Sequence, residues 1–343
     1  AGGTNTTASN NTAIGASALK VNTTGTVNTA IGRESLICNT TGSSNTGLGS
    51  NTLARVTTSG CNTAVGHNSL FNNTAANNTA VGYSALVANT SGTENVAVGT
   101  SALCKNTTAN SNTAVGTNAL FTNTTGATNT ALGNGAMFAN TTGSNNVAVG
   151  KNALDANTTG CQNTALGAFS LDDVTTGCQN VGVGYGSGAN ITTGVCNTAL
   201  GHNSLNTATT GDNNVAVGRQ ALYSNTTAAQ NTAVGKDSML DNTTGANNVA
   251  VGFNALCDNT TGACNVAVGV FTLDANTTAS SNTGLGYGAL SVNTTGSKNT
   301  AVGFYSLLEN TTGTQNTVIG LEAMRYGTTG SYNVALGACT LGA

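Results

Sequence analysis

A 17-residue unit that opens with Asn and continues as Thr/Val-Ala-Val-Gly recurs twenty times, and this repeat constrains the fold more than any other feature. Every step is 17 residues except one of 16, between the fourth and fifth units. A short unit at a fixed period is the signature of a solenoid, in which each unit packs only on its neighbours. The opening asparagines are Asn11, Asn28, Asn45, Asn62, Asn78, Asn95, Asn112, Asn129, Asn146, Asn163, Asn180, Asn197, Asn214, Asn231, Asn248, Asn265, Asn282, Asn299, Asn316 and Asn333.

Counted from that Asn as position 1, the consensus is N-[T/V]-A-[V/I/L]-G-x-x-A-L-x-x-N-T-T-G-x-x. Position 5 is Gly in all twenty units, position 4 is always Val, Ile or Leu, and position 9 is Leu in sixteen units. This internal constancy indicates that every unit meets the same environment. We therefore expect a single solenoid over residues 11–343, preceded by a partial coil or overlap segment at residues 1–10.

The composition narrows the class of protein. Charged residues are 6% of the chain, aromatic residues 4%, and Pro and Trp are absent, whereas disordered chains are rich in charge and Pro. The net charge of −3 is thinly spread, without a basic stripe for nucleic acid or an apolar run of the ~20 residues that span a bilayer. We therefore expect neither a nucleic-acid partner nor insertion into a membrane. Nine cysteines favour an oxidising location, outside the cell or at a cell or virion surface.

Seven of the 17 consensus positions are Gly, Asn or Thr, which oppose a helix. We predict an all-β fold, a parallel β-solenoid in the form of a flattened β-roll, with about twenty coils of two short strands each, stacked at ~4.8 Å. Positions 2, 4 and 9 are expected inside and Ala at position 3 outside, where it would form with position 8 a flat face for lateral association. The asparagines at positions 1 and 12 should form stacked ladders. Gly188 stands at position 9, so the coil Asn180–Cys196 should be the least well packed.

The segment T/V-A-V-G-x-x-A resembles the head repeat of YadA-like trimeric autotransporter adhesins, whose units read like S-V-A-I-G-x-x-A. The longer form N-T-A-V-G-x-x-A-L…N-T-T-G is similar to repeats of phage tail-fibre and related surface-fibre proteins. The resemblance covers Asn11 to Ala343. It implies left-handed parallel β-rolls packed as trimers, and an adhesive or fibre function at a surface.

Residues for catalysis are scarce, so we expect no enzyme, no cofactor and no metal site. The two histidines, His67 and His202, both occupy position 6 but lie eight coils apart, too far to share a metal or a substrate. Acidic side chains stacked on adjacent coils are interpreted as solvated groups rather than a cation site, because Ca²⁺ requires 6–8 oxygen ligands. These pairs are Asp155 with Asp172 and Asp241 with Asp258.

The repeat frame also indicates which cysteines can meet. Cys161 and Cys178 occupy position 16 of successive coils, so their Cα atoms are expected about 5 Å apart, within disulfide range. Cys257 and Cys264 flank one N-T-T-G turn and could staple it. The odd total leaves at least one cysteine free or bonded to another chain. The alternative is that all of them are small exposed or half-buried residues.

Thirteen turns carry N-T-[T/S] at position 12, the acceptor motif for N-glycosylation on an exposed turn. Turn chemistry alone also explains the motif, since such a turn favours Asn, Thr and Gly. The candidate acceptors are Asn22, Asn39, Asn89, Asn106, Asn123, Asn140, Asn157, Asn225, Asn242, Asn259, Asn276, Asn293 and Asn310.

Three functions fit a regular solenoid. The first is an extracellular filament in which the chain associates with itself. A second chain placed head to tail would continue the coil in phase, because Ala343 is at position 11 and Asn5 reads as position 12. The expected junction has Ala1 to Thr4 as the overlap and Leu341 in the last coil. The second is an adhesin or tail-fibre shaft that carries a tip for a surface receptor or glycan. The third, ice binding by a threonine array, is disfavoured because the threonines of position 2 are expected to face inward.

Overall fold

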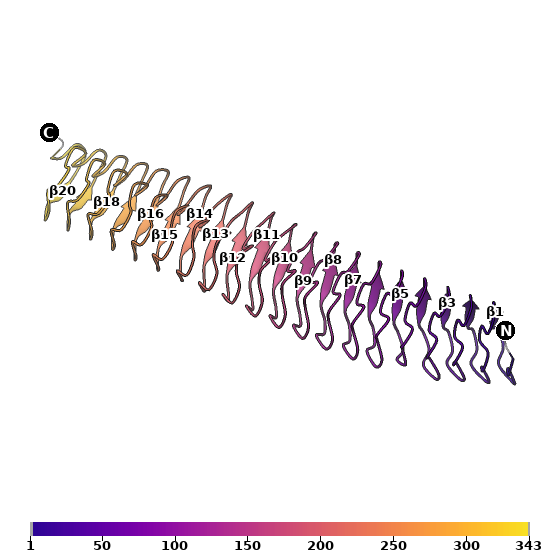
Figure 1. Cartoon of the computed structure of the whole chain (residues 1–343). Coiled ribbons are helices and arrows are strands. Elements are labelled where there is room, and N and C mark those ends of the chain that lie inside the picture. The colour runs from indigo at the N-terminus through magenta and orange to yellow at the C-terminus, as the bar shows by residue number, and fades with distance from the viewer. Residues whose placement is uncertain (1–2, 342–343) are drawn as a thin grey trace. The chain divides into compact units, whose positions relative to one another are not determined.

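The computed structural model describes residues 3–341, and each 17-residue unit forms one turn of a β-solenoid. The chain divides into two compact units, Ala1–Thr176 and Gly177–Ala343. Ten strands, drawn from indigo to magenta in Figure 1, belong to the first unit. They are β1 (Thr12–Ile14), β2 (Thr29–Ile31), β3 (Thr46–Leu48), β4 (Thr63–Val65), β5 (Thr79–Val81), β6 (Val96–Val98), β7 (Thr113–Val115), β8 (Thr130–Leu132), β9 (Val147–Val149) and β10 (Thr164–Leu166).

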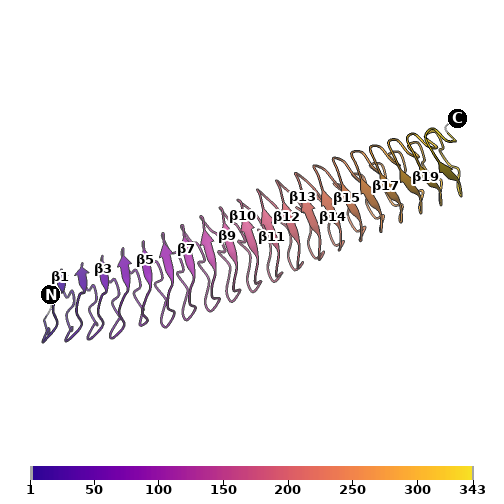
Figure 2. The ribbon, with the colours of Figure 1, turned by 180° about the vertical axis from the view of Figure 1, so that it is seen from behind.

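The second unit repeats this arrangement, and Figure 2 shows its coils from behind. Within each unit, consecutive strands pair in parallel and in register, so that Thr12 lies beside Thr29 in the first unit and Val215 beside Thr232 in the second. The prediction of a parallel β-solenoid is confirmed. The strands of the second unit are β11 (Val181–Val183), β12 (Thr198–Leu200), β13 (Val215–Val217), β14 (Thr232–Val234), β15 (Val249–Val251), β16 (Val266–Val268), β17 (Thr283–Leu285), β18 (Thr300–Val302), β19 (Thr317–Ile319) and β20 (Val334–Leu336).

Each coil has one strand, not the two that we predicted. The segment around position 9 departs from β geometry because the residues at positions 7 and 9 have left-handed backbones, as at Glu34 (φ 59°) and Leu36 (φ 52°). Left-handed geometry costs a non-glycine residue roughly 1–2 kcal/mol. Inter-coil hydrogen bonds offset this cost, since Leu36 N donates to Thr52 O at 3.0 Å. The backbone thus remains paired between coils where no strand is present.

The strand faces opposite to our prediction. Ala at position 3 points into the coil and is fully buried at Ala148, whereas its neighbours Val147 and Val149 lie on the outer face, with Val147 36% exposed. Position 9 is inside as predicted, with Leu154 fully buried. Position 8 is buried as well, so positions 3 and 8 provide no flat outer face of alanines.

The physical reason is the narrow interior of the coil. A Cβ added at Gly47, at position 3, would lie 2.5 Å from Ser35 Oγ and 2.7 Å from Thr52 Oγ1, both at position 8. Two opposing walls this close leave room for Ala but not for a Val or Ile on every coil. The larger β-branched residues of positions 2 and 4 therefore occupy the outer face.

The glycine at position 5 ends the strand, as predicted, for two reasons. Its φ lies between 115° and 140° along the chain, a conformation that L side chains rarely adopt. A side chain would also strike the next coil, because a Cβ added at Gly133 would lie 2.3 Å from Gly150 O. The coil Asn180–Cys196 lacks the core Leu at Gly188, but Ile191 is fully buried in the same coil. The looser packing of that coil remains a prediction.

Candidate functional site

Two ladders of asparagine side chains run inside the coils of each unit and link neighbouring coils. At position 12, Asn140 Nδ2 donates to Asn123 Oδ1 of the preceding coil (2.8 Å) and to Gly143 O of its own turn (3.0 Å). At position 1, Asn146 Oδ1 accepts from the backbone N of Asn163 at 2.9 Å. The predicted ladders are confirmed, with the difference that position 1 bonds chiefly to backbone.

The N-glycosylation candidates are these ladder asparagines, and our expectation that they lie on an exposed turn is wrong. All thirteen side chains are fully buried: Asn22, Asn39, Asn89, Asn106, Asn123, Asn140, Asn157, Asn225, Asn242, Asn259, Asn276, Asn293 and Asn310. A glycan would replace an Nδ2 hydrogen that already has an internal acceptor, as at Asn140. The folded coil therefore cannot carry a sugar on these side chains without breaking the ladder.

The position-12 ladder is interrupted where another residue replaces Asn. Asn39, Asn157 and Asn310 each precede such a coil, and the Oδ1 of each is buried without a hydrogen-bond donor. The following coils carry Val56, Val174 and Gly327 at position 12. A buried acceptor without a donor costs about 1–3 kcal/mol, so each interruption marks a local weak point.

The outer strand face consists of the residues at positions 2 and 4, which we call the outer β-face. Position 2 is Thr in thirteen coils and Val in seven, and position 4 holds only Val, Leu or Ile. Several of the large side chains are well exposed, including Leu132 at 45% and Leu285 at 46%. Our reason for disfavouring ice binding, an inward position 2, is therefore wrong. The threonine rank is nevertheless broken by Val, and position 4 offers no hydroxyl beside it.

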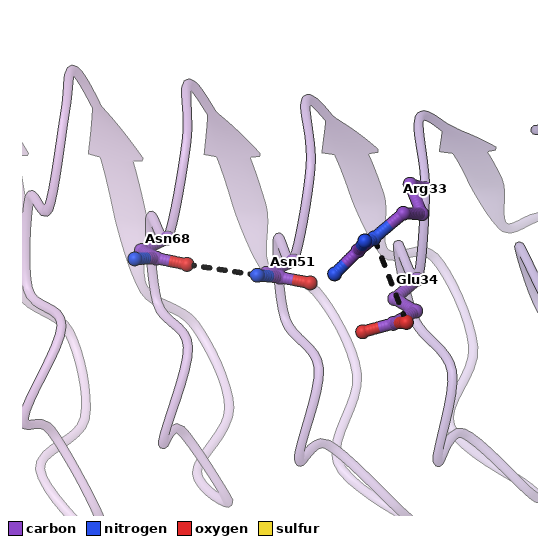
Figure 3. A network of polar contacts seen from close by, with 4 residues as sticks. All are labelled: Arg33, Glu34, Asn51 and Asn68. Carbon is purple, nitrogen blue, oxygen red and sulfur yellow. Dashed lines mark hydrogen bonds and ion pairs between the residues drawn. The ribbon is translucent and has the colours of Figure 1, made fainter.

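Positions 6 and 7 form a second outer strip where like side chains stack from coil to coil. Figure 3 shows Asn51 Nδ2 donating to Asn68 Oδ1 (3.2 Å) beside the exposed ion pair of Arg33 with Glu34. Each histidine stacks on the tyrosine of an adjacent coil, with ring centroids of His67 and Tyr83 5.6 Å apart. In the second unit, His202 stacks in the same way on Tyr185. The sequence frame placed these rings in one rank, but we did not predict the stacking.

The longest stack on this strip is aromatic and lies in the second unit. Ring centroids are separated by 5.3 Å between Phe253 and Phe271, 6.0 Å between Phe271 and Tyr287, and 5.4 Å between Tyr287 and Phe304. Lys236 Nζ lies 4.9 Å from the Phe253 ring centroid as a cation–π contact. Such contacts each contribute about 0.5–1.5 kcal/mol and couple neighbouring coils on their solvent side.

The acidic residues that we interpreted as solvated are only partly so. Burial, reinforced by the charges of Asp155 and Asp173, raises the pKa of Asp172 to about 6. Burial also raises the pKa of Asp155. Asp241 is exposed on the surface. Within residues 3–341, no three His, Cys, Asp or Glu side chains gather as a metal site.

The disulfide candidates remain predictions. Cys161 belongs to the first compact unit and Cys178 to the second, and both are half-buried. Cys257 is a half-buried thiol and Cys264 an exposed one. Burial and the nearby carboxylates of Asp258, Asp241 and Asp237 raise the pKa of Cys257 to about 12, which keeps it in the unreactive thiol form.

Of the predicted junction residues, Ala1 and Ala343 lie outside the described residues. Asn5 follows the ladder register, because Asn22 Nδ2 donates to Asn5 Oδ1 at 3.3 Å. Thr4 Oγ1 donates to Lys20 O at 3.2 Å. Leu341 is at position 9 and is 60% exposed. Asn5 thus bonds as a position-12 asparagine does, and the polymer junction remains a prediction.

No family model matches the chain, and no curated protein matches it. The part of the chain from residue 3 to residue 341 contains no helix long and apolar enough to cross a membrane. By its fold, the chain is a repeat protein, a parallel β-solenoid of 17-residue coils.

Proposed function

We propose that this protein is a structural, non-catalytic component of an extracellular filament or fibre, built by addition of coils edge to edge. The observation that carries the proposal is the repetition of the same backbone bonds on both sides of each coil. Thr113 N donates to Asn129 O of the following coil, and Gly116 N donates to Val98 O of the preceding one, both at 2.8 Å. The same bonds recur from coil to coil in each unit.

This repetition has a consequence for association. Since each coil offers one set of groups forward and the complementary set backward, the exposed edge of one stack matches the opposite edge of another. A contact between different, complementary surfaces that does not close on itself generates a filament. Unpaired edge groups are in addition strong templates for strand addition. The position-1 asparagine ladder would extend across such a junction, because it follows the same edge-to-edge direction, with Asn333 N donating to Asn316 Oδ1 in the last coil.

Electron microscopy and fibre diffraction of the purified chain test this proposal. We expect fibres much longer than one chain, with a reflection near 4.8 Å along the fibre axis because coils stack in that direction. Deletion of residues 1–10 should shorten or abolish the fibres while leaving the coils folded, as judged by circular dichroism. A chain that stays a discrete particle at every concentration would contradict the filament and support the adhesin or tail-fibre shaft instead.

The outer β-face supports side-by-side packing of filaments. Its two positions accept only Thr, Val, Leu and Ile, although exposed positions elsewhere in the coil accept charged residues, as at Lys298. The exchange of Thr for Val at position 2 preserves shape and not hydrogen bonding, as expected of a packed surface. Ten strands of three residues cover on the order of 430 Å² per unit at ~4.8 Å by ~3.3 Å spacing, which is comparable to the largest apolar patch of a typical monomer, a kind of surface that is often functional.

A matched pair of substitutions tests the lateral contact. Leu132→Lys places a charge on the outer β-face, and Thr128→Lys places the same charge on a nearby exposed position outside this face. We expect Leu132→Lys to yield single, unbundled filaments and Thr128→Lys to leave bundles intact. If both variants bundle like the unmodified chain, the outer β-face is not the lateral contact.

A further inference from the structure

Position 14 carries an exposed hydroxyl in every full-length coil. All eighteen 17-residue coils that reach this position have Thr there, except for Ser91. Each of these side chains is exposed, from Thr24 to Thr329. The 16-residue coil is the exception, since its shortened turn has Ala75 and Ala76 in this region. Neighbouring exposed position 17 varies freely, with Glu94, Lys298 and Tyr332 among its residues.

With Thr176 set aside, the hydroxyls of position 14 form no hydrogen bond within residues 3–341. At position 13, Thr124 Oγ1 donates to Thr141 O of the next coil at 3.0 Å, and the equivalent bond recurs along both units. Internal structure therefore explains the first Thr of the Thr-Thr pair but not the second.

Substitution within the repeat shows which property of position 14 is kept. At position 2, Thr alternates with Val, so the shape is kept and the hydroxyl is dispensable. At position 14, Thr alternates only with Ser, so the hydroxyl is kept and the shape is dispensable. The hydroxyl is kept on every full coil and, with Thr176 set aside, has no internal partner in the described residues, which implies chemistry with something outside the chain.

The Asn-linked glycosylation motif does not account for this rank. The Asn of position 12 is buried, and five coils replace it by another residue while keeping Thr at position 14. In these coils position 12 is Val56, Val174, Ile191, Ala208 or Gly327. The threonine thus persists where the motif is absent, which separates the two.

We propose that the position-14 hydroxyls are sites of O-linked glycosylation, which form a ridge of sugars along one edge of the coils. In the modification, the bond from the sugar C1 to the phosphate of a sugar nucleotide breaks, and a new C1–Oγ bond to the threonine forms. The hydroxyl proton passes to a base of the transferring enzyme, and the nucleoside diphosphate leaves. Sugars on successive coils would stand about 4.8 Å apart.

The surface chemistry of the chain is consistent with this coat. Only 6% of the residues are charged, far below the about 25% of a typical soluble domain, and the outer β-face carries no charged residue. A polar layer on one edge would keep the coils hydrated without adding charge. It would also leave the outer β-face, formed by positions 2 and 4, uncovered.

Glycopeptide mass spectrometry of the protein from its natural source, with fragmentation that keeps sugars attached, tests the proposal. We expect sugars on position 14 and none on position 13, released by alkaline β-elimination but not by an amidase specific for Asn-linked glycans. In the producing cell, Thr125→Val should remove one glycan, whereas Thr125→Ser should retain it. Thr124→Val, the matched control at position 13, should keep the full number of glycans.

The outcomes separate modification from a structural role. Thr125→Val should leave the melting temperature of unglycosylated chain unchanged, and Thr124→Val should lower it because the bond to Thr141 is lost. Unmodified position-14 peptides in the natural protein would overturn the proposal, as would sugars found only on asparagine. Filament formation is measured separately by electron microscopy, so the filament proposal and the O-glycosylation proposal can each fail without the other.

Discussion

Thr272 and Gly284 form a size-matched pair across the interior of adjacent coils: a Cβ added at Gly284 would lie 2.6 Å from Thr272 Cγ2. In ten of the nineteen pairs of adjacent coils, Ala stands at position 8 of one coil and at position 3 of the next, whereas a larger residue at position 8 is met here by a smaller one at position 3. The pair shows directly how little space separates the two walls of the coil.

Gly284→Ala should therefore destabilise the second unit by about 1–3 kcal/mol, the usual effect of overpacking. The double variant Thr272→Ala with Gly284→Ala restores the common alanine pair and should recover most of this loss. Thermal unfolding of both single variants and the double variant gives the coupling free energy. Additive effects, without recovery in the double variant, would show that the two side chains do not share one space.

Val56→Asn should stabilise the first unit by about 1 kcal/mol, because Asn39 Oδ1 is buried without a donor. The new amide would stand in the ladder between Asn39 and Asn73, with its Nδ2 placed to donate to Asn39. Chemical denaturation measures the effect, and Val56→Leu is the control that supplies no donor. A less stable Val56→Asn variant would mean that the lost apolar burial outweighs the completed ladder.

Substitutions on opposite sides of one strand test its facing. Ala148→Leu should lower the free energy of unfolding by about 1–3 kcal/mol because position 3 has no space for added methylenes. Val149→Thr keeps the shape on the outer face and should change it by less than about 0.5 kcal/mol, as is usual for surface positions. Equal losses from the two substitutions would argue against the structure described above.

Leu154→Asp should separate the coils on either side of it, because an unpaired charge would replace a fully buried side chain. We expect a lower melting temperature and rapid hydrogen exchange localised to the coil that opens at Asn146 and to its neighbours, which open at Asn129 and Asn163. The exposed control is Lys151→Asp, three residues earlier in the same coil. A melting temperature unchanged by Leu154→Asp would contradict the buried position 9.

Asp172 should make stability depend on pH. Its pKa is raised to about 6, chiefly by burial and then by the charges of Asp155 and Asp173, so the folded chain holds a proton that the unfolded chain releases above about pH 4. Stability from this group is present below about pH 4 and is lost as the pH rises through 6. Asp172→Asn should thus stabilise the protein at pH 8, by at most about 1 kcal/mol after allowance for solvent screening.

The same variant should show no gain at pH 3.5, where Asp172 is protonated in both states. Melting temperatures measured from pH 3.5 to pH 8 provide the comparison, and Asp241→Asn serves as an exposed control. A gain that is constant across this range would assign the effect to the amide itself and not to titration.

The sequence frame predicted the period, the buried Leu of position 9, the asparagine ladders and the role of the position-5 glycine. It predicted the wrong face of the strand because we interpreted the constant β-branched shape of position 2 and the aliphatic residues of position 4 as signs of a core, whereas the narrow interior accepts the smaller Ala148. The left-handed backbone at residues such as Leu36 was not predictable, since Leu rarely adopts it and only inter-coil bonds offset its cost. The N-T-T motif led to the wrong prediction of exposed asparagines, because the same three residues occur in a buried asparagine ladder and in an exposed glycosylation acceptor.

The glycines of position 5 also determine the register in which neighbouring coils pair. Coils with nearly the same sequence could pair one residue out of register. Such a shift would place a residue with a Cβ where a glycine now lies, and a Cβ at Gly133 would lie only 2.3 Å from Gly150 O. The one coil of irregular length keeps this alignment: Thr63 still pairs with Thr79, and Gly66 still faces Gly82. Its missing residue is taken from the turn at Ala75 and Ala76. The row of position-5 glycines thus fixes the register between coils, so that a chain of nearly identical units folds with a single alignment.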